Sequence, residues 1–505
     1  MRILWILRGI AEQKSRGVAS EESQAQSQPY GEILELMARH STPHTRHFTL
    51  DTQKRTMKNH SLKVINPAKL GADGIPAELI ELEGNYNYKP NIGVMPDGEL
   101  LMATLHEHYE EACTGGRYTI HTVMYRSRDG GRSWSRGEHM RFFGHEPSIT
   151  IIDGVVFVLT HFCSNPGHDF EVFADEDYIY DMLYRSADGG HTWEEMPLKV
   201  EMFEGAVKAD MAYTRNIFRL ADGRLFLGMS VGKLDYACYS EDMGKTWQPL
   251  KADIRGFAYR DNYPWGAFGE SVVFHSPSGR LMMLSRMDLA YACFDPPLPF
   301  AQKMDKTGLD RYDGEILFES TDGGVTWQPL RAVGFPGLMY PGVVNLPDGR
   351  LLVNYTVREV PPEGTGAVHP RIGVQAVLVE ERDDGLMDFS MEQDLIVIDD
   401  KTPECLTSGG GFGRTVLLED GTLVTPYSYL WADEEVTRMA KNKEYLKPEV
   451  FNKYGAMVVP PETYDSRSES EEMLRYSFAA IWGNHQLMNK AAIRTEVVRW
   501  GLIRT

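Results

Sequence analysis

Six residues with charged or phenolic side chains recur at similar places along the sequence. Each stands a few positions before a turn that is followed by an apolar run. A carboxylate can act as a general acid or base, and a guanidinium group can hold another carboxylate through paired hydrogen bonds. These groups predict a polar ligand site, with a ring of structural ion pairs as the alternative interpretation. The six residues are Lys89, Glu146, Arg215, Glu270, Tyr340 and Arg414.

The turns after these residues begin a repeat of a turn followed by a strand. Successive copies start 56, 69, 56, 70 and 72 residues apart, which fits four short strands and their loops per unit. Six units that repeat radially predict an all-β fold, a six-bladed β-propeller with four-stranded antiparallel blades. The copies are PDGELLMAT (96–104), IDGVVFVLT (152–160), ADGRLFLGMS (221–230), PSGRLMMLS (277–285), PDGRLLVNYT (347–356) and EDGTLVTPYS (419–428).

An octapeptide recurs once in each of the first four units. Each copy follows a short β-type run, and its Asp-Gly-Gly core predicts a tight turn, because glycine supplies positive φ and aspartate caps its own backbone. A degenerate copy, DDGLMDF (383–389), stands in the fifth unit. The four copies are SRDGGRSW (127–134), SADGGHTW (186–193), SEDMGKTW (240–247) and STDGGVTW (320–327).

The two ends of the chain have different patterns. The tail TEVVRWGLIRT (495–505) reads as a strand, and we expect it to pair with an N-terminal strand from SLKVINP or AELIELEG, which would close the ring and remove the sheet edges. Residues 1–60 show no propeller pattern and are predicted to be an N-terminal extension to a propeller of residues 61–505. Residues 432–447, and parts of 467–490, predict a helical insertion in the last blade.

Composition excludes several classes of partner. The 505 residues include 52 Lys and Arg against 72 Asp and Glu, a formal net charge of −20, which argues against nucleic-acid or membrane partners. Five widely spaced cysteines without a CxxC pattern argue against a disulfide framework and a cysteine zinc site. The start has only a five-residue apolar run before Arg8, so we expect a cytoplasmic protein unless the true start lies elsewhere.

The octapeptide SxDGGxTW is identified as the Asp-box, and four copies in a six-unit chain resemble the sialidase (neuraminidase) superfamily. The resemblance covers roughly residues 61–505. It implies a six-bladed propeller whose Asp-boxes are structural turns on the face away from the active site. It also implies that the innermost strand of each blade lines a central channel, where the six charged and phenolic residues would lie.

Unit four carries the sharpest resemblance, in GESVVFHSPSGRLMMLSR. In sialidases a glutamate opens this strand and supports a tyrosine nucleophile, and an arginine closes the next strand and clamps the substrate carboxylate. The resemblance implies these roles for Glu270 and Arg286. The sequence differs from the sialidase pattern at two places. Lys89 occupies the place of an arginine in the first unit, and the last unit has Phe412 and Arg414 where the tyrosine is expected.

Two chemistries remain open. For a sugar acid, Lys89, Arg215, Arg286 and Arg414 would hold the carboxylate, and Tyr340 or Tyr427 would be the nucleophile activated by Glu270. For a neutral or uronic glycan, Glu146 and Glu270 would form the carboxylate pair of a general glycosidase, whose separation distinguishes retention at about 5–5.5 Å from inversion at about 6.5–9.5 Å. The displaced tyrosine slightly favours the second mechanism.

Histidines and an arginine are predicted at the channel mouth. His106 and His108 end a strand two residues apart and so project to the same side, His161 ends the corresponding strand of the next unit, and Arg117 lies at a strand end. We expect substrate contacts from them, with ordinary hydrogen bonds at the rim as the commoner interpretation. No metal or cofactor is predicted.

The sequence thus predicts an exo-acting glycoside hydrolase that cleaves a terminal sialic-acid-like or other acidic sugar from a glycan. A non-catalytic glycan-binding propeller and a polysaccharide lyase acting on uronates are the alternatives, because a fold does not fix a function. The oligomeric state, the linkage and the stereochemical outcome stay open.

Overall fold

The computed structural model describes residues 57–502, with gaps at 83–86, 111–116, 141, 143–144, 162–177, 200–201, 207–210, 232–233, 256–266, 288–313, 334–337, 358–370, 390–392, 403–412, 435–436 and 439–490. The chain divides into two units, residues 1–52 and 53–505, and only the second contains described residues. The predicted extension therefore lies outside the described residues, apart from its last four positions. There the first strand begins, at Lys58.

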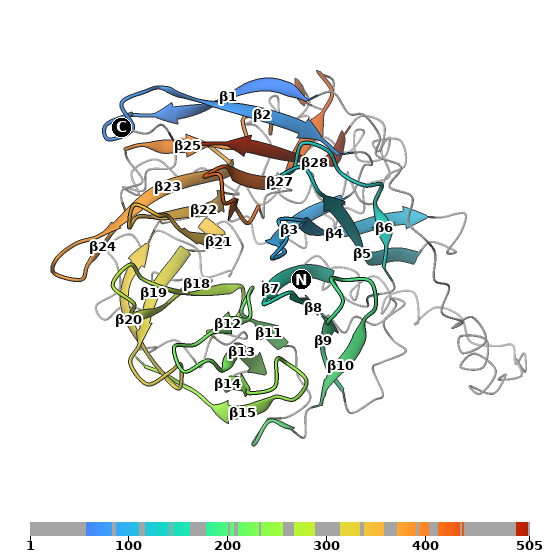
Figure 1. The fold of residues 1–505 in the computed structure, drawn as a ribbon, viewed down its shortest axis with the longest axis vertical. Coiled ribbons are helices and arrows are strands. Elements are labelled where there is room, and N and C mark those ends of the chain that lie inside the picture. Colours follow the sequence, from blue (N-terminus) through green and yellow to red (C-terminus); the bar gives the residue numbers. More distant parts are fainter. Residues whose placement is uncertain are drawn as a thin grey trace, which may run out of the picture. The chain divides into compact units, whose positions relative to one another are not determined.

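The first four predicted units form separate antiparallel sheets of four or five strands (Figure 1). The first contains β3 (Asn87–Val94), β4 (Leu100–Glu110), β5 (Arg117–Ser127) and β6 (Glu138–His139). The second contains β7 (His145–Ile152), β8 (Val155–His161), β9 (Tyr178–Ser186) and β10 (Glu194–Lys199). The third contains β11 (Met211–Tyr213), β12 (Phe218–Arg219), β13 (Leu225–Val231), β14 (Leu234–Ser240) and β15 (Gln248–Lys251). The fourth contains β17 (Ser271–His275), β18 (Leu281–Met287), β19 (Gly314–Ser320) and β20 (Thr326–Val333), to which β16 (Asp253–Ile254) adds in parallel.

The fifth and sixth predicted units are joined into one ten-stranded sheet. The fifth contributes β21 (Leu338–Asn345), β22 (Leu351–Val357), β23 (Gly373–Glu381), β24 (Met387–Asp388) and β25 (Leu395–Val397). The sixth contributes β26 (Val416–Leu417), β27 (Leu423–Ala432), β28 (Ala491–Trp500) and β2 (Gly74–Glu81). Strand β1 (Lys58–Ile65) pairs with β2 on one side and β25 on the other.

The chain ends close the ring as predicted. C-terminal β28 pairs antiparallel with N-terminal β2, from Ala77 opposite Trp500 to Glu81 opposite Glu496. The closing strand is thus the one that contains AELIE, and SLKVI forms β1 beside it. Because β2 supplies the outer strand of a sheet whose other strands come last in the chain, neither β2 nor β28 is left as an open edge.

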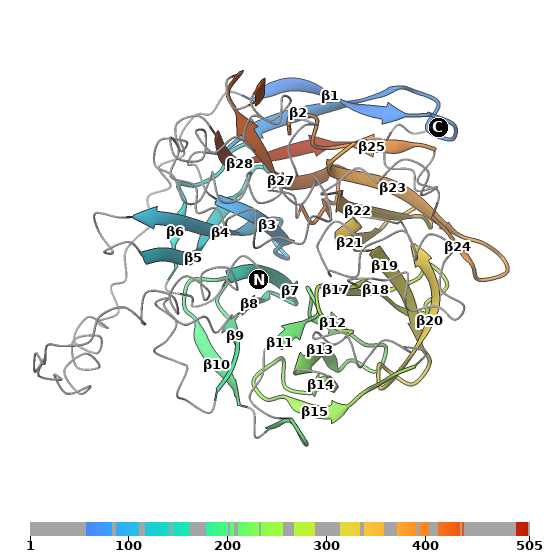
Figure 2. The same ribbon diagram turned by 180° about the vertical axis from the view of Figure 1, so that it is seen from behind.

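Apolar side chains fill the spaces between consecutive sheets. Strands β13 (LFLGMSV) and β22 (LLVNYTV) are buried at every position, because a sheet packed on both faces needs apolar side chains on both. Among the described residues, six apolar clusters each join two consecutive units, the last of them linking the sixth unit to the first. The arrangement is that of a β-propeller, with β3, β7, β11 and β21 near the centre (Figure 1) and β17 beside them in the reverse view (Figure 2).

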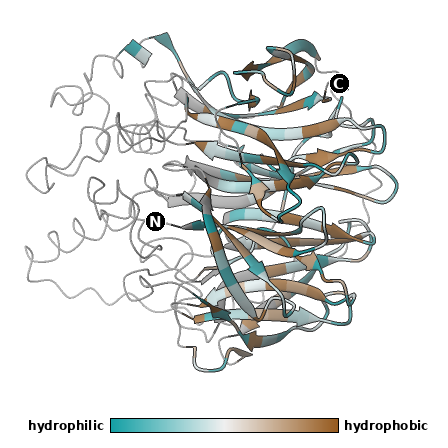
Figure 3. Ribbon diagram, turned by 90° about the vertical axis from the view of Figure 1, so that its left-hand side faces the viewer, coloured by the Kyte–Doolittle hydropathy of each residue, from teal (hydrophilic) through white to brown (hydrophobic). Residues whose placement is uncertain are grey.

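The octapeptides form turns at the strand ends and hold themselves together by hydrogen bonds. In the second unit, Ser186 Oγ donates to Asp188 Oδ1 at 2.7 Å, and Asp188 Oδ2 accepts from Thr192 Oγ1 at 2.6 Å. Burial raises the pKa of Asp188, but these hydrogen bonds outweigh burial and hold it well below the usual range. These aspartates are turn residues, and Figure 3 shows the described turns along one edge of the strands.

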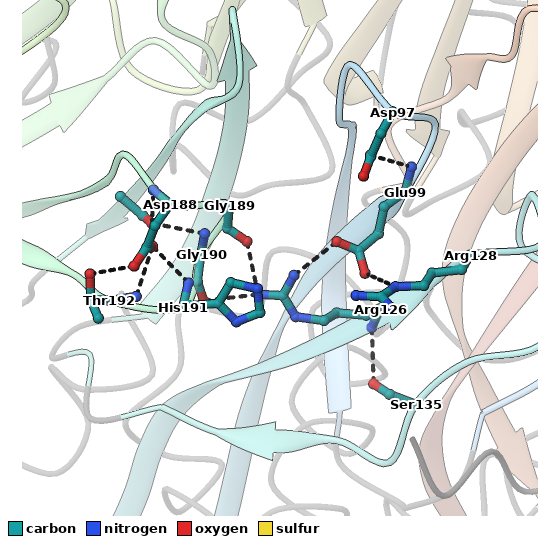
Figure 4. Close-up of polar contacts among 11 residues, drawn as sticks. Asp97, Glu99, Arg126, Arg128, Ser135, Asp188, Gly189, Gly190, His191 and Thr192 are labelled. Carbon is teal, nitrogen blue, oxygen red and sulfur yellow. Dashed lines mark hydrogen bonds and ion pairs between the residues drawn. The ribbon is translucent and has the colours of Figure 1, made fainter. Parts of the chain in front are cut away.

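Each such turn also accepts a hydrogen bond from the preceding unit. Arg126, just before the first octapeptide, donates from Nη2 to the carbonyls of Gly189 and Gly190 at 2.9 Å, as Figure 4 shows. Arg185 donates in the same way to the carbonyl of Met243 at 2.8 Å, and Tyr239 to that of Gly323 at 3.0 Å. Arg499 of β28 donates to the carbonyl of Gly130 at 2.6 Å, so the device links the last unit to the first.

The predicted helical insertion falls largely outside the described residues. Glu434, Thr437 and Arg438 have helical backbone, and the amide of Thr437 donates to the carbonyl of Asp433 at 3.0 Å. Within the described part of the chain, no helix is long and apolar enough to cross a membrane.

Candidate active site

Local distortions of the inner strands bring the predicted residues to the centre. Strands β3, β7 and β21 each shift register against their neighbour, at 88–91, 145–148 and 339–342. Lys89, Glu146 and Tyr340 lie in these bulges with φ of 53°, 58° and 56°, a left-handed conformation that usually requires glycine. Bulges redirect side chains, so the distortion re-aims a charged or phenolic group at each point.

The residue after each bulged position is proline, which fits the bulge because it needs no ladder partner for a backbone N–H. These are Pro90, Pro147 and Pro341. Glu270, immediately before β17, has the same left-handed backbone, with φ of 56°. Four of the six predicted positions therefore share one unusual conformation. At three of them an X-Pro pair was its signal in the sequence.

Polar contacts between inner strands fix neighbouring units relative to each other. Asn91 Oδ1 accepts from the amide of Ile149 at 3.3 Å. Asn216 exchanges two hydrogen bonds with the backbone of Val273, at 2.8 and 2.9 Å. Asn354 contacts the last unit through the carbonyl of Gly413 and the amide of Thr415. These contacts lie within a few residues of the charged positions and so hold the site in place.

Five charged side chains from four units form one continuous chain of ion pairs. Lys89 pairs with Glu146, Glu146 with Arg215, and Arg286 with Glu270. Arg215 Nη2 also donates to Glu270 Oε1 at 2.7 Å. The side chains are 11–20% exposed, so water screens the pairs little. Positive and negative groups alternate along the chain, which ends in a cation on each side.

Tyr340 lies against this ion-pair chain. Its hydroxyl accepts from Arg286 Nη1 at 3.3 Å and is hydrogen-bonded to Glu270. The positive groups of Lys89, Arg215 and Arg286 lie 5.7, 5.2 and 5.4 Å from the centre of its ring. Burial raises the pKa of Glu270, but the charges of Arg286, Arg215 and Lys89 outweigh burial and hold the pKa well below its usual range. Glu270 is therefore ionised, and its hydrogen bond places the carboxylate beside the Tyr340 hydroxyl.

A cavity that is partly open to solvent lies at the same place. Five of the six predicted residues line it, all except Glu270, which contacts it through Arg215 and Tyr340. These five residues come from different units and lie around one cavity. The sequence did not identify the remaining lining residues, which are Asn91, Pro147, Val272, Pro341 and Gly342.

Glu315 is a further residue that the sequence analysis missed. It lies on β19 directly opposite Arg286 on β18, is 2% exposed, and neither carboxyl oxygen has a hydrogen-bond partner among the described residues. Burial raises the pKa of Glu315 well above its usual range, with Arg286 opposing and Glu270 adding to the rise. A glutamate inside the apolar strand GEILFES was the available signal.

The other predicted residues are placed as follows. His106, on β4, has Nδ1 2.6 Å from Asn87 Oδ1 and packs edge-on against His139. Of His108, Arg117 and His161 only the backbone is described, at the ends of β4, β5 and β8, and their side chains lie outside the described part. No group of His, Cys, Asp and Glu side chains in the described part is arranged to hold a metal.

Tyr427 lies away from the cavity, which corrects its predicted position. Its side chain is fully buried in the cluster between the fifth and sixth units. The hydroxyl donates to Glu496 Oε2 at 2.7 Å, across the β27–β28 pair, and Glu496 also pairs with Lys401. Tyr427 follows the turn and therefore lies on β27, which has β26 on one side and β28 on the other. It does not lie on the strand of the unit that is nearest the centre of the ring.

The sequence matches no described protein family and no curated protein. Solved structures with a similar fold include a protein of unknown function from Dyadobacter fermentans, at 17% identity and a TM-score of 0.49, covering 74% of this chain and 94% of that one. The NanB sialidase from Streptococcus pneumoniae has 14% identity and a TM-score of 0.45, covering 68% of this chain and 65% of that one. An α-L-arabinanase from Penicillium chrysogenum has 14% identity and a TM-score of 0.39, covering 73% and 94%. Likenesses at this level carry no argument about activity.

Proposed function

We propose that this protein is a retaining, exo-acting glycoside hydrolase that releases a terminal acidic sugar. The observation that carries the proposal is the contact of the Tyr340 hydroxyl with both Glu270 and Arg286 beside the central cavity. A phenol that can pass its proton to an ionised carboxylate is an activated nucleophile. Tyr340 also lines the central cavity, which is partly open to solvent, so a ligand that enters it can reach the phenol.

In the proposed reaction, the Tyr340 oxygen attacks the anomeric carbon while its proton passes to Glu270. The bond to the leaving oxygen breaks, the leaving oxygen takes a proton from water, and a glycosyl–tyrosine intermediate forms. The resulting hydroxide then attacks the anomeric carbon, the tyrosine oxygen leaves and takes its proton back from Glu270, and the sugar is released with its configuration retained. Arg215 and Arg286 stabilise the negative charge that develops on the tyrosine oxygen, since both lie against the ring or the hydroxyl.

The ion-pair chain argues against a mechanism that uses Glu146 and Glu270 alone. Both accept from the same nitrogen, Arg215 Nη2, so their nearest oxygens lie within about 6 Å. This excludes the separation of about 6.5–9.5 Å of inverting enzymes and is compatible with the separation of about 5–5.5 Å of retaining ones. A general acid must also hold a proton, whereas paired cations keep Glu270 ionised. In the tyrosine mechanism Glu270 first accepts a proton instead of donating one, which fits its ionised state.

A panel of aryl glycosides tests the proposal on the purified protein. An aryl leaving group departs as a phenolate and needs no protein acid, so the panel isolates the nucleophilic step. We expect hydrolysis of an aryl sialoside or uronide and slower or no hydrolysis of neutral glycosides. Turnover of no substrate would favour a glycan-binding propeller, for which the pairing of both carboxylates is the supporting observation.

A further inference from the structure

The cations of the site differ in whether a carboxylate already neutralises them. Lys89, Arg215 and Arg286 each form an ion pair with Glu146 or Glu270. A ligand carboxylate that bound one of these three would have to displace a protein carboxylate from a poorly screened pair. The three paired cations are therefore already occupied in the protein without ligand.

Arg414 lines the same cavity without a carboxylate. It forms no ion pair with any residue in the described part, and its one hydrogen bond runs from Nη1 to the carbonyl of Ile149 at 3.4 Å. A guanidinium group has five N–H donors, so most of its capacity is unused. Burial lowers the pKa of Arg414, and no carboxylate counteracts that effect.

Close contacts of Gly413 fix the backbone immediately before Arg414. A Cβ atom at Gly413 would lie 2.0 Å from the carbonyl oxygen of Pro426, so only glycine lets this segment approach β27 so closely. Gly413 also accepts from Asn354 of the fifth unit. Two neighbouring elements thus fix the point from which Arg414 extends toward Ile149 of the second unit.

We propose that Arg414 is the specificity-determining residue that receives the acidic group of the sugar, through paired N–H donors to its carboxylate. The inference rests on the proposed function for the identity of the ligand as a sugar acid. Binding there neutralises a buried charge and breaks no existing ion pair. Lys89, Arg215 and Arg286 then serve to position Glu146, Glu270 and Tyr340.

Direct binding measurements test the assignment without relying on turnover. The probes are sodium glucuronate and N-acetylneuraminate, with glucose as the neutral arm and sodium phosphate as the inorganic arm, titrated calorimetrically at constant ionic strength. The proteins are wild type, Arg414→Gln, Arg414→Lys and the control Arg224→Gln. Arg224 forms its ion pair with Asp222 on a turn and does not line the cavity.

We expect at least one sugar acid to bind wild type, with a Kd about tenfold or more weaker in Arg414→Gln, partly restored in Arg414→Lys and unchanged in Arg224→Gln. Equal affinity in Arg414→Gln, no binding of either acid to wild type, or glucose or phosphate binding as tightly as the acids would overturn the inference. Arg414-dependent binding without hydrolysis of any glycoside would leave the inference standing and contradict the proposed function alone.

Discussion

Four residues at the centre of this propeller have a backbone conformation that costs free energy in any residue except glycine. Lys89, Glu146, Glu270 and Tyr340 all have φ between 53° and 58°. Strain of this kind persists where the surrounding structure enforces it, and it gathers at functional sites. Here ion pairs and bulges enforce it, which holds the tyrosine and its carboxylate ready before a ligand arrives.

The unpaired carboxyl of Glu315 has a consequence for stability. Its pKa is raised in the folded state, so it keeps a proton that the unfolded chain releases above a pKa of about 4.3. The contribution of Glu315 to the free energy of unfolding is complete below that pH. It decreases as the pH rises toward the pKa of the folded state, by at most about 1.4 kcal/mol per pH unit. We expect Glu315→Gln to gain stability over wild type with rising pH, measured by urea unfolding between pH 4 and 8.

Glu319→Gln, on the same strand, is the matched control. Hydrogen bonding and ion pairing with Arg280 lower the pKa of Glu319, so the sign is opposite. This variant should lose stability relative to wild type at neutral pH and approach wild type in acid. A constant difference between Glu315→Gln and wild type across the range would show that folding does not raise the pKa of Glu315.

At the scale of elements, the octapeptide turns fasten one unit to the next. The turn closes on itself through its serine and aspartate, which leaves its backbone carbonyls free to accept from the neighbouring sheet. An arginine or tyrosine just before one octapeptide reaches the turn of the following unit in the first three units. The repeated motif thus contributes to the alignment of the inner strands that carry the site.

Arg126→Met tests how much these hydrogen bonds between neighbouring units contribute to stability. Arg126 is 15% exposed in its side chain and bonds two carbonyls of the next turn and Glu99, so we expect a loss of about 2–3 kcal/mol in the free energy of unfolding. Arg128 bonds the same Glu99 but is 60% exposed, so Arg128→Met should cost less than about 1 kcal/mol. Equal losses in guanidinium unfolding would mean that the turn contacts add nothing.

At the scale of the whole molecule, closure depends on strands from opposite ends of the chain. Trp500 of β28 is 2% exposed, lies opposite Ala77 and donates to Thr425 Oγ1 at 3.0 Å. The packing of the sixth unit therefore joins both ends of the sequence. A local change near the C-terminus should act on the entire ring.

Trp500→Ala should lower the free energy of unfolding by about 3–5 kcal/mol although it lies near the chain end. Trp431→Ala, on the neighbouring β27, removes a half-buried tryptophan and should cost less. Chemical unfolding followed by far-UV circular dichroism compares the two. A loss below about 1 kcal/mol in Trp500→Ala would contradict a closure that depends on β28.

The repeat spacing predicted the fold and the meeting of the six central residues because turn position and strand length are local properties. The repeat spacing could not predict which side chains form ion pairs with each other. That Arg215 bridges Glu146 and Glu270, whereas Arg414 has no carboxylate, depends on bulges and on side-chain reach across the ring. Tyr427 was misplaced because its Tyr-Ser pattern ignores which strand of the sheet it occupies. Glu315 was overlooked because its place opposite Arg286 depends on the pairing of β19 with β18, which the sequence does not show.

The rate of aryl glycoside hydrolysis by Tyr340→Phe, compared with wild type, tests the central claim most directly. Phenylalanine keeps the ring between the cations of the site and removes only the hydroxyl that contacts Glu270 and Arg286. The account predicts that wild type hydrolyses an acidic aryl glycoside and that kcat of Tyr340→Phe falls by about 100-fold or more. Hydrolysis by Tyr340→Phe at the wild-type rate would contradict it.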